Sequence, residues 1–89
     1  MKKITTSSGF KCEVNPNIAK DWRFMKALGK CQHNDTALDG AIEVETALLG
    51  VKGAEALEKH LEELDGFVSA EKLFAELTEI LGALDDSKN

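Results

Sequence analysis

Residues 70–84, Ala-Glu-Lys-Leu-Phe-Ala-Glu-Leu-Thr-Glu-Ile-Leu-Gly-Ala-Leu, carry the strongest structural pattern in the chain. Their apolar side chains recur at spacings of one and three residues, which predicts an amphipathic helix with a broad apolar stripe. Ser69 directly precedes the segment and is a favourable N-cap. The glutamates Glu71, Glu76 and Glu79 fall outside this stripe. The stripe consists of Leu73, Phe74, Leu77, Ile80, Leu81 and Leu84.

Two more helices are predicted immediately upstream, joined through Gly50 and Gly53. The first spans residues 36–49, with Asn34 or Asp35 as its N-cap; Gly40 inside it costs about 1 kcal/mol relative to alanine. The second spans residues 54–64 and ends in an Asp65-Gly66 turn. Their expected core-facing residues are Leu38, Ala41, Ile42, Leu48 and Leu49 in the first helix, and Ala56, Leu57, His60, Leu61 and Leu64 in the second.

A further helix is predicted at residues 16–31. Asn15 as N-cap followed by Pro16 is a favourable start, because proline lacks the amide that would stay unbonded there. Basic residues occupy the opposite side of this helix. The expected buried stripe is Ile18, Trp22, Met25 and Leu28.

The first fourteen residues predict a β-hairpin, because alternating segments flank the turn-forming Ser7-Ser8-Gly9. Phe10, Cys12 and Val14 fall on one face of the second strand. An isolated hairpin is marginal in water, so we expect it to pack on the helices or to pair with another strand edge. The predicted fold is α+β and mainly α, one small domain over residues 1–89: a hairpin at 2–14, about four short helices at 16–84, and a flexible tail at 85–89.

Length and composition narrow the class of protein. The 89 residues fit one domain, and 43% hydrophobic residues argue against wholesale disorder. No apolar run reaches the roughly 18 residues that a membrane span needs, and no apolar stretch follows the basic start as in a signal peptide. We therefore expect a soluble intracellular protein that does not bind membranes.

The net charge of −5 hides a strong asymmetry. Residues 1–33 carry seven basic and two acidic side chains, whereas residues 34–89 carry four basic and fourteen acidic ones. Three interpretations stay open: ordinary solvated faces, a contact between the basic half of one subunit and the acidic half of another, and a nucleic-acid surface on the basic half. The acidic half repels phosphate, which argues against a nucleic-acid surface on residues 34–89. The basic charges of residues 1–33 are spread over the hairpin and one face of a short helix.

No catalytic, cofactor or metal site is predicted, so we expect a non-enzymatic protein. Cys31 and His33 offer two metal ligands, with His60 and Cys12 as the remaining candidates, but a zinc site needs three or four at suitable spacing. A Cys–His nucleophile pair has no orienting third group. His60 is expected at the edge of the core with one hydrogen bond. Glu62, Glu63 and Asp65 are expected to form a solvated face.

Several short motifs occur in a recognisable order. Trp22 is preceded by two short motifs, Lys3-Ile4-Thr5 and Ser8-Gly9-Phe10-Lys11-Cys12-Glu13-Val14. It is followed by three more, Leu48-Leu49-Gly50, Leu57…His60-Leu61 and Asp65-Gly66-Phe67-Val68. This order resembles the tail assembly chaperones of long-tailed (siphovirus-type) phages and prophages of Gram-positive bacteria. The helix bearing Trp22 is more basic here than in that family.

The resemblance implies a small, mostly helical chaperone in the cytoplasm of the bacterial host, one that tends to form homo-oligomers. Its partners would be the tape measure protein, which it keeps soluble, and the major tail protein, which polymerises around the tape measure. Apolar helix stripes recognise other amphipathic helices. The partner-binding hypothesis names Trp22, Met25, Leu28, Leu73, Phe74, Leu77, Leu81 and Leu84.

A small regulatory DNA-binding module is the alternative function. Its recognition helix would be residues 16–31, the only basic candidate, shared with Trp22 and Met25.

Overall fold

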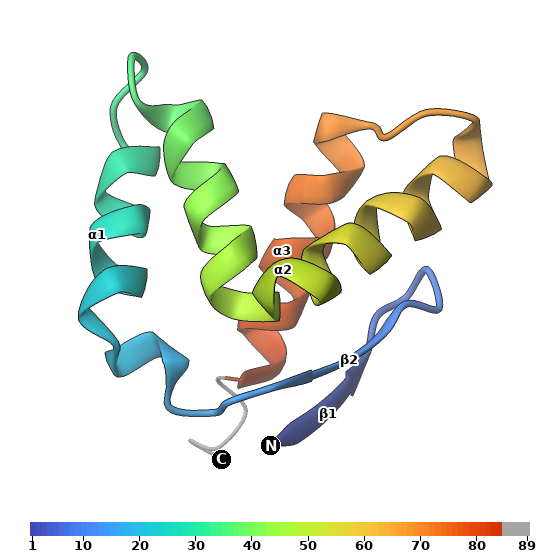
Figure 1. The fold of residues 1–89 in the computed structure, drawn as a ribbon, viewed down its shortest axis with the longest axis horizontal. Helices are drawn as coiled ribbons and strands as arrows, with labels where there is room; N and C mark the ends of the chain where they lie inside the picture. The colour runs from blue at the N-terminus through green and yellow to red at the C-terminus, as the bar shows by residue number, and fades with distance from the viewer. Residues whose placement is uncertain (85–89) are drawn as a thin grey trace.

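The N-terminal hairpin forms as predicted. In the computed structural model, which describes residues 1–84, β1 (Lys2–Thr5) and β2 (Lys11–Val14) pair antiparallel with Lys2 opposite Val14 and Thr5 opposite Lys11 (Figure 1). The turn contains Gly9 at a φ of 92°, a left-handed value that favours glycine. Phe10 and Val14 are buried and Cys12 is half-buried, so the predicted inner face of the second strand is confirmed. The predicted tail at 85–89 lies outside the described residues.

The predicted helix at 16–31 begins later than expected. A short 3-10 turn, η1 (Ile18–Lys20), comes first, and Asp21 then adopts an extended conformation with a ψ of 133°. The Asp21 carboxylate accepts a hydrogen bond from the Arg23 amide at 2.8 Å and caps α1 (Trp22–Cys31). An aspartate cap of this kind competes with helix continuation, and that competition explains the late start.

The buried side of α1 also differs from the predicted stripe. Phe24 and Ala27 are buried, with Phe24 only 2% exposed, whereas Trp22 is 68% exposed. Met25 and Leu28 are exposed as well, although Leu28 only just. The stripe was wrong because apolar residues surround most of this helix, so spacing alone allows more than one buried face.

Three helices are present in the described residues, so the expected count of about four is wrong. The two helices predicted on either side of Gly50 form one element, α2 (Ala37–Asp65), which bends where Gly50 takes a non-helical φ of 76° and ψ of 169° (Figure 1). We call residues 37–49 the first arm and residues 51–65 the second arm. The joint lies at Gly50 as predicted, whereas Gly53, which was predicted to belong to it, is helical.

The first arm packs closely on α1 at Gly40. An added Cβ there would lie 2.7 Å from the Cys31 nitrogen and 2.8 Å from the Ala27 carbonyl oxygen, both backbone atoms. This close approach explains a glycine within a helix. It also turns Val44 and Glu45 inward, so Leu38 and Ile42 are exposed, contrary to prediction. The N-cap position of the first arm is Thr36, whereas Asn34 or Asp35 was predicted. The Thr36 side chain makes no capping hydrogen bond, because its hydroxyl donates to the Lys30 carbonyl oxygen.

The second arm ends at the predicted turn. Gly66 adopts a left-handed φ of 82° and its amide donates to the Glu62 carbonyl at 2.7 Å, a glycine C-cap. Leu57 and Leu61 of this arm are buried as expected, whereas Ala56 and Leu64 are exposed. Ser69 then accepts from the Lys72 amide and begins α3 (Ala70–Leu84) as predicted.

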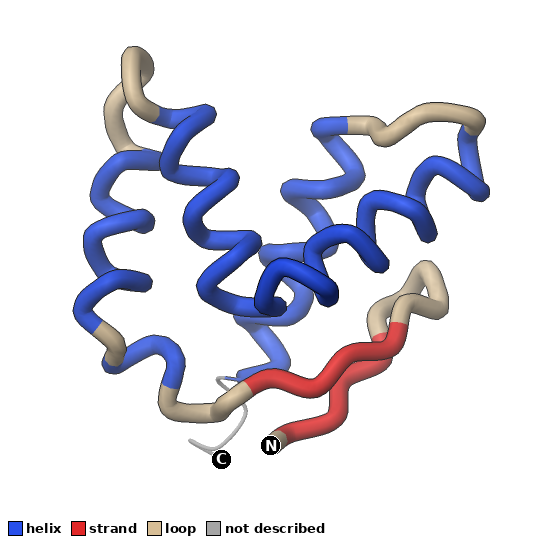
Figure 2. Tube along the Cα trace, viewed as in Figure 1, coloured by secondary structure: helices blue, strands red, loops and turns tan. Residues whose placement is uncertain are grey.

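The core lies where the hairpin, α1, α3 and the bent α2 meet, and α1 packs along the first arm (Figure 2). α3 buries Leu77 and Ile80 from its predicted stripe, together with Glu76, which was expected outside it. None of the described helices combines the length and the hydropathy needed to cross a membrane. The buried core consists of Ile4, Phe10, Val14, Phe24, Ala27, Val44, Leu48, Leu57, Leu61, Leu77 and Ile80.

Candidate partner-binding surface

An apolar groove runs between α1 and α3, and the first arm of α2 forms the floor of its larger part. It consists of two adjoining hollows of about 380 Å³ and about 290 Å³, which share Leu28 and Leu81. The larger hollow is lined by Leu28, Cys31, Ala37, Ala41, Val44, Phe74, Leu77, Thr78 and Leu81. The smaller is lined by Pro16, Ala19, Phe24, Leu28, Leu81 and Leu84.

Five of the eight residues proposed from the sequence line this groove: Leu28, Phe74, Leu77, Leu81 and Leu84. Leu73 is half-buried and packs against the core instead. Trp22 and Met25 lie outside the lining and are exposed. The groove therefore combines residues from helices far apart in the sequence, while the two most exposed residues of the proposal lie elsewhere on α1.

Phe74 is the aromatic side chain that the groove leaves most accessible. It is 47% exposed and stands on α3 facing the larger hollow, whereas Leu77 beside it is almost fully buried. An aromatic side chain in this position offers a large apolar contact at small entropic cost, as interface anchors do. Phe74 is thus the groove residue best placed to contact a partner without also holding the core together.

The floor of the groove was not predicted. Ala41 was assigned to a core stripe, and Val44 and Cys31 to none, yet all three face the larger hollow. Ala37 and Ala41 are small, so the floor is recessed between the leucines of α1 and α3. The four-residue spacing of Ala37 and Ala41 was the available signal, but its meaning depends on which helix lies opposite.

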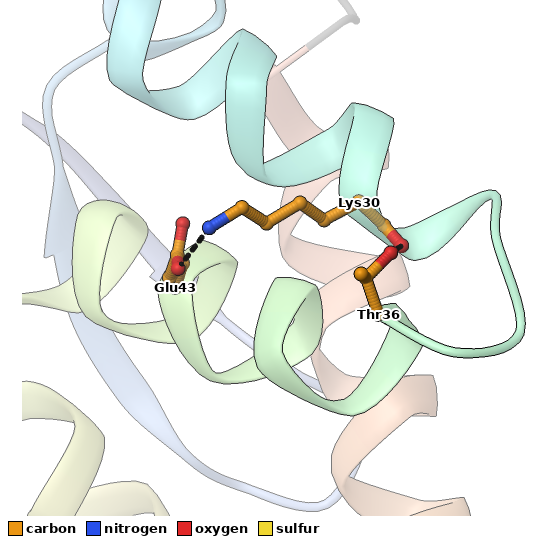
Figure 3. Close-up of polar contacts among 3 residues, drawn as sticks. All are labelled: Lys30, Thr36 and Glu43. Atoms are coloured by element: carbon orange, nitrogen blue, oxygen red, sulfur yellow. Dashed lines mark hydrogen bonds and ion pairs between the residues drawn. The ribbon is translucent and has the colours of Figure 1, made fainter.

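The basic side of α1 faces away from the groove. Arg23 and Lys26 line a hollow of about 600 Å³ between α1 and the first arm. Lys30 donates a hydrogen bond to a Glu43 carboxylate oxygen at 2.6 Å, and this bond raises the pKa of Lys30 (Figure 3). The Thr36 hydroxyl donates to the Lys30 carbonyl at 2.8 Å and ties the same two helices together (Figure 3). One basic charge of this helix is therefore already matched within the chain.

Two glutamates are buried in the protein interior. Glu45 on the first arm is only 4% exposed, and one of its carboxylate oxygens has no hydrogen-bond partner. Burial, together with a hydrogen bond to Glu58 on the second arm and the negative charge of that residue, raises the Glu45 pKa to about 7. Glu76 on α3 also has an unpartnered buried oxygen. Burial and the nearby charge of Glu76 raise the pKa of the Cys12 thiol.

The histidines and cysteines do not come together. His60 lies at the edge of the core as predicted, and its ring is 5.6 Å from the Phe10 ring. Its Nε2 atom is 3.1 Å from the Ser8 hydroxyl and 3.2 Å from the Ser8 carbonyl oxygen, two contacts where one was expected. Cys31 and His33 are exposed, and Cys12 is a free thiol in the hairpin. Among residues 1–84, no group of three or more His, Cys, Asp or Glu side chains is arranged to hold a metal ion.

The fold and groove define a small helical protein with an open apolar surface. No protein-family model, no curated protein and no solved structure matches the chain.

Proposed function

We propose that this protein is a non-enzymatic tail assembly chaperone of a long-tailed phage or prophage, acting in the cytoplasm of its Gram-positive host. It binds apolar helical segments of the tape measure protein and keeps that protein soluble until the major tail protein polymerises around it. The observation that carries the proposal is the apolar groove between α1 and α3, lined by Leu28, Phe74 and Leu81. The resemblance of the sequence motifs to those of such chaperones suggests the identity of the partner.

The shape and charge of the protein support this role. A groove of leucine and phenylalanine side chains over an alanine floor suits the apolar stripe of an amphipathic helix. Many large apolar side chains outside the groove are also exposed, including Trp22, Ile42 and Phe67. Such surfaces mark interaction sites in small proteins, and the net charge of −5 helps to keep the free protein in solution. Self-association through these surfaces is part of the proposal.

The test is co-expression with a tape measure protein from the phage or prophage that encodes this chain. We expect the chain to move the tape measure protein into the soluble fraction, and Phe74→Asp to reduce that fraction severalfold. Because Phe74 is half exposed, its substitution should leave the circular dichroism spectrum unchanged. Ala75→Asp is the matched control, since Ala75 is exposed on the same helix and does not line the groove.

Two results would count against the chaperone. One is a tape measure protein that stays insoluble beside the unaltered chain. The other is full solubilisation by a correctly folded Phe74→Asp variant. Salt-sensitive retention on duplex DNA, lost on replacing Arg23 and Lys26, would instead favour the DNA-binding module.

A further inference from the structure

The turn between α2 and α3 exposes a cluster of large apolar side chains. Leu64 at the end of the second arm and Phe67 in the turn are both more than half exposed, and Val68 beside them is exposed as well. We call these three residues the apolar corner. Clustered apolar side chains on the surface of a small protein mark a contact with another molecule.

Acidic side chains surround the apolar corner. Glu62 and Glu63 precede it on the last turn of the second arm, and Glu71 follows it on the first turn of α3. All three are exposed, and within residues 1–84 none of them forms an ion pair. Asp65, by contrast, is paired with Lys72 at 2.7 Å. The corner therefore presents apolar surface together with unpaired negative charge.

The hollow of about 600 Å³ between α1 and the first arm has the opposite charge. Arg23 and Lys26 line it, and both are exposed and make no ion pair within the described part of the chain. The charge of Glu43 is already matched by Lys30. Apolar side chains complete the lining. We call this site the basic hollow; it consists of Arg23, Lys26, Ile42, Glu43, Thr46 and Ala47.

The apolar corner and the basic hollow are complementary in shape, hydropathy and charge. The corner is a turn at the ends of two helices, whereas the hollow is recessed between two others. Drug-sized ligands occupy pockets of about 300–1,000 Å³, so the hollow has room for the Phe67 side chain against Ile42. The acidic side chains of the corner would then face the basic ones of the hollow. An aromatic anchor in a pocket with a charged rim is the usual anatomy of a protein interface.

The two surfaces lie too far apart to meet within one chain. Figure 1 shows α1 at one side of the molecule and the turn between α2 and α3 at the opposite side. A corner can therefore reach a basic hollow only in another copy. Neither surface contributes a residue to the apolar groove, so their contact leaves the groove open.

We propose that copies of this chain associate head to tail, with the apolar corner of one copy seated in the basic hollow of the next. Phe67 is the anchor, and Glu62 and Glu63 pair with Arg23 and Lys26 of the partner subunit. Because two different surfaces meet, a pair of copies still has one free corner and one free hollow, and assembly continues into a ring or a filament. The inference names the surfaces for the self-association that the proposed function includes, and in that respect it rests on the proposed function.

The test reverses the charges of one surface at a time in the full chain and measures assembly by sedimentation velocity over a range of concentrations. One variant carries Arg23→Glu and Lys26→Glu, and the other carries Glu62→Lys and Glu63→Lys. We expect the parent to assemble and each variant alone to need a concentration at least about tenfold higher, because like charges then face each other. An equal mixture of the two variants should assemble like the parent, since each supplies the surface that the other lacks. All four positions are exposed, so the circular dichroism spectra should match that of the parent.

Two control variants separate the contact from effects of net charge. Lys3→Glu with Lys11→Glu changes the net charge as much as the first variant does, and Glu13→Lys with Glu55→Lys matches the second. These positions are exposed and belong to neither surface, so both controls should assemble like the parent. Phe67→Ser removes the apolar anchor without changing the charge, and it should weaken assembly by about tenfold.

Several outcomes would overturn the head-to-tail contact. A parent chain that stays monomeric at every concentration rejects it. A charge-reversed variant or a Phe67→Ser variant that assembles like the parent also rejects it, as does a mixture of the two reversed variants that stays monomeric. Loss of assembly in the controls would mean that net charge, and not these two surfaces, decides association.

The measurement needs no tape measure protein, so its failure is distinct from failure of the chaperone assignment. Phe74→Asp alters the groove alone and should assemble like the parent. A chain that assembles head to tail but leaves the tape measure protein insoluble would reject the proposed function and retain the contact. A monomeric chain that keeps the tape measure protein soluble would reject the contact and retain the chaperone.

Discussion

Trp22 and Phe24 lie two positions apart in the sequence, but their side chains differ strongly in burial. Both are large aromatic residues on α1, yet Trp22 is 68% exposed and Phe24 is 2% exposed. Phe24 contributes to the core and to the smaller hollow of the groove, whereas Trp22 projects from another side of the helix. The energetic roles of these residues should differ accordingly.

Replacement of each residue by alanine tests this difference. Phe24→Ala should lower the free energy of unfolding by about 3–5 kcal/mol, because it leaves a cavity in the core. Trp22→Ala should change it by no more than about 0.5 kcal/mol, as is usual for surface positions. Urea unfolding followed by circular dichroism measures both, since the signal does not depend on Trp22. Equal losses of unfolding free energy in the two variants would mean that Trp22 is buried in solution, for example in an interface between subunits.

At the scale of elements, the contact between α1 and α2 depends on one missing side chain. Gly40 lets the first arm approach α1 so closely that backbone atoms of Cys31 and Ala27 lie 2.7 and 2.8 Å from where a Cβ would be. Gly82 in α3 has nothing within 4 Å of the corresponding position. The two glycines have the same local helix propensity but different tertiary surroundings.

Alanine at these two glycines should therefore act in opposite directions. Gly40→Ala should lower the unfolding free energy by about 1–3 kcal/mol, because α1 and α2 must separate to admit the methyl group. Gly82→Ala should raise it by about 0.5–1 kcal/mol through helix propensity alone. Thermal unfolding of the two variants beside the parent decides the matter, and a stabilised Gly40→Ala chain would contradict the close approach.

At the scale of the whole molecule, the stability of the fold is coupled to pH through Glu45. Its pKa rises from an ordinary value of 4.5 to about 7 on folding, so the folded state holds the proton more tightly than the unfolded state. For a raised pKa of an acid, the contribution to stability is fully present below about 4.5 and is lost as the pH rises to about 7. The buried carboxyl thus favours folding in mild acid and opposes it above neutrality.

Glu45→Gln should remove this dependence. Above neutral pH the variant should exceed the parent in unfolding free energy by about 1–3 kcal/mol, because a buried, unpartnered charge is lost. The gap should shrink as the pH falls below about 7. Urea titrations across this range measure it, with Glu55→Gln as a control that should follow the parent. A gap that widens toward acid would mean that Glu45 is ionised in the folded state throughout.

Local chemistry accounts for the elements that the sequence predicted correctly. The hairpin turn at Gly9, the C-cap at Gly66, the N-cap at Ser69 and the break at Gly50 each depend on the residue's own backbone preference or side-chain hydrogen bond. Such signals act over a few residues and are readable without the fold. The α3 side of the candidate groove was predictable for the same reason, since its apolar stripe is long and regular.

The tertiary structure decided which apolar face each helix buries, and with it the remainder of the groove. Around α1 the apolar residues Trp22, Phe24, Met25 and Leu28 occupy more than one side, so helical periodicity admits several buried faces. The approach of α2 at Gly40 selects Phe24 and Ala27, and the same packing encloses Glu45 in the interior. Contacts between residues distant in sequence make these choices, because the free energy of burial depends on what lies opposite a side chain.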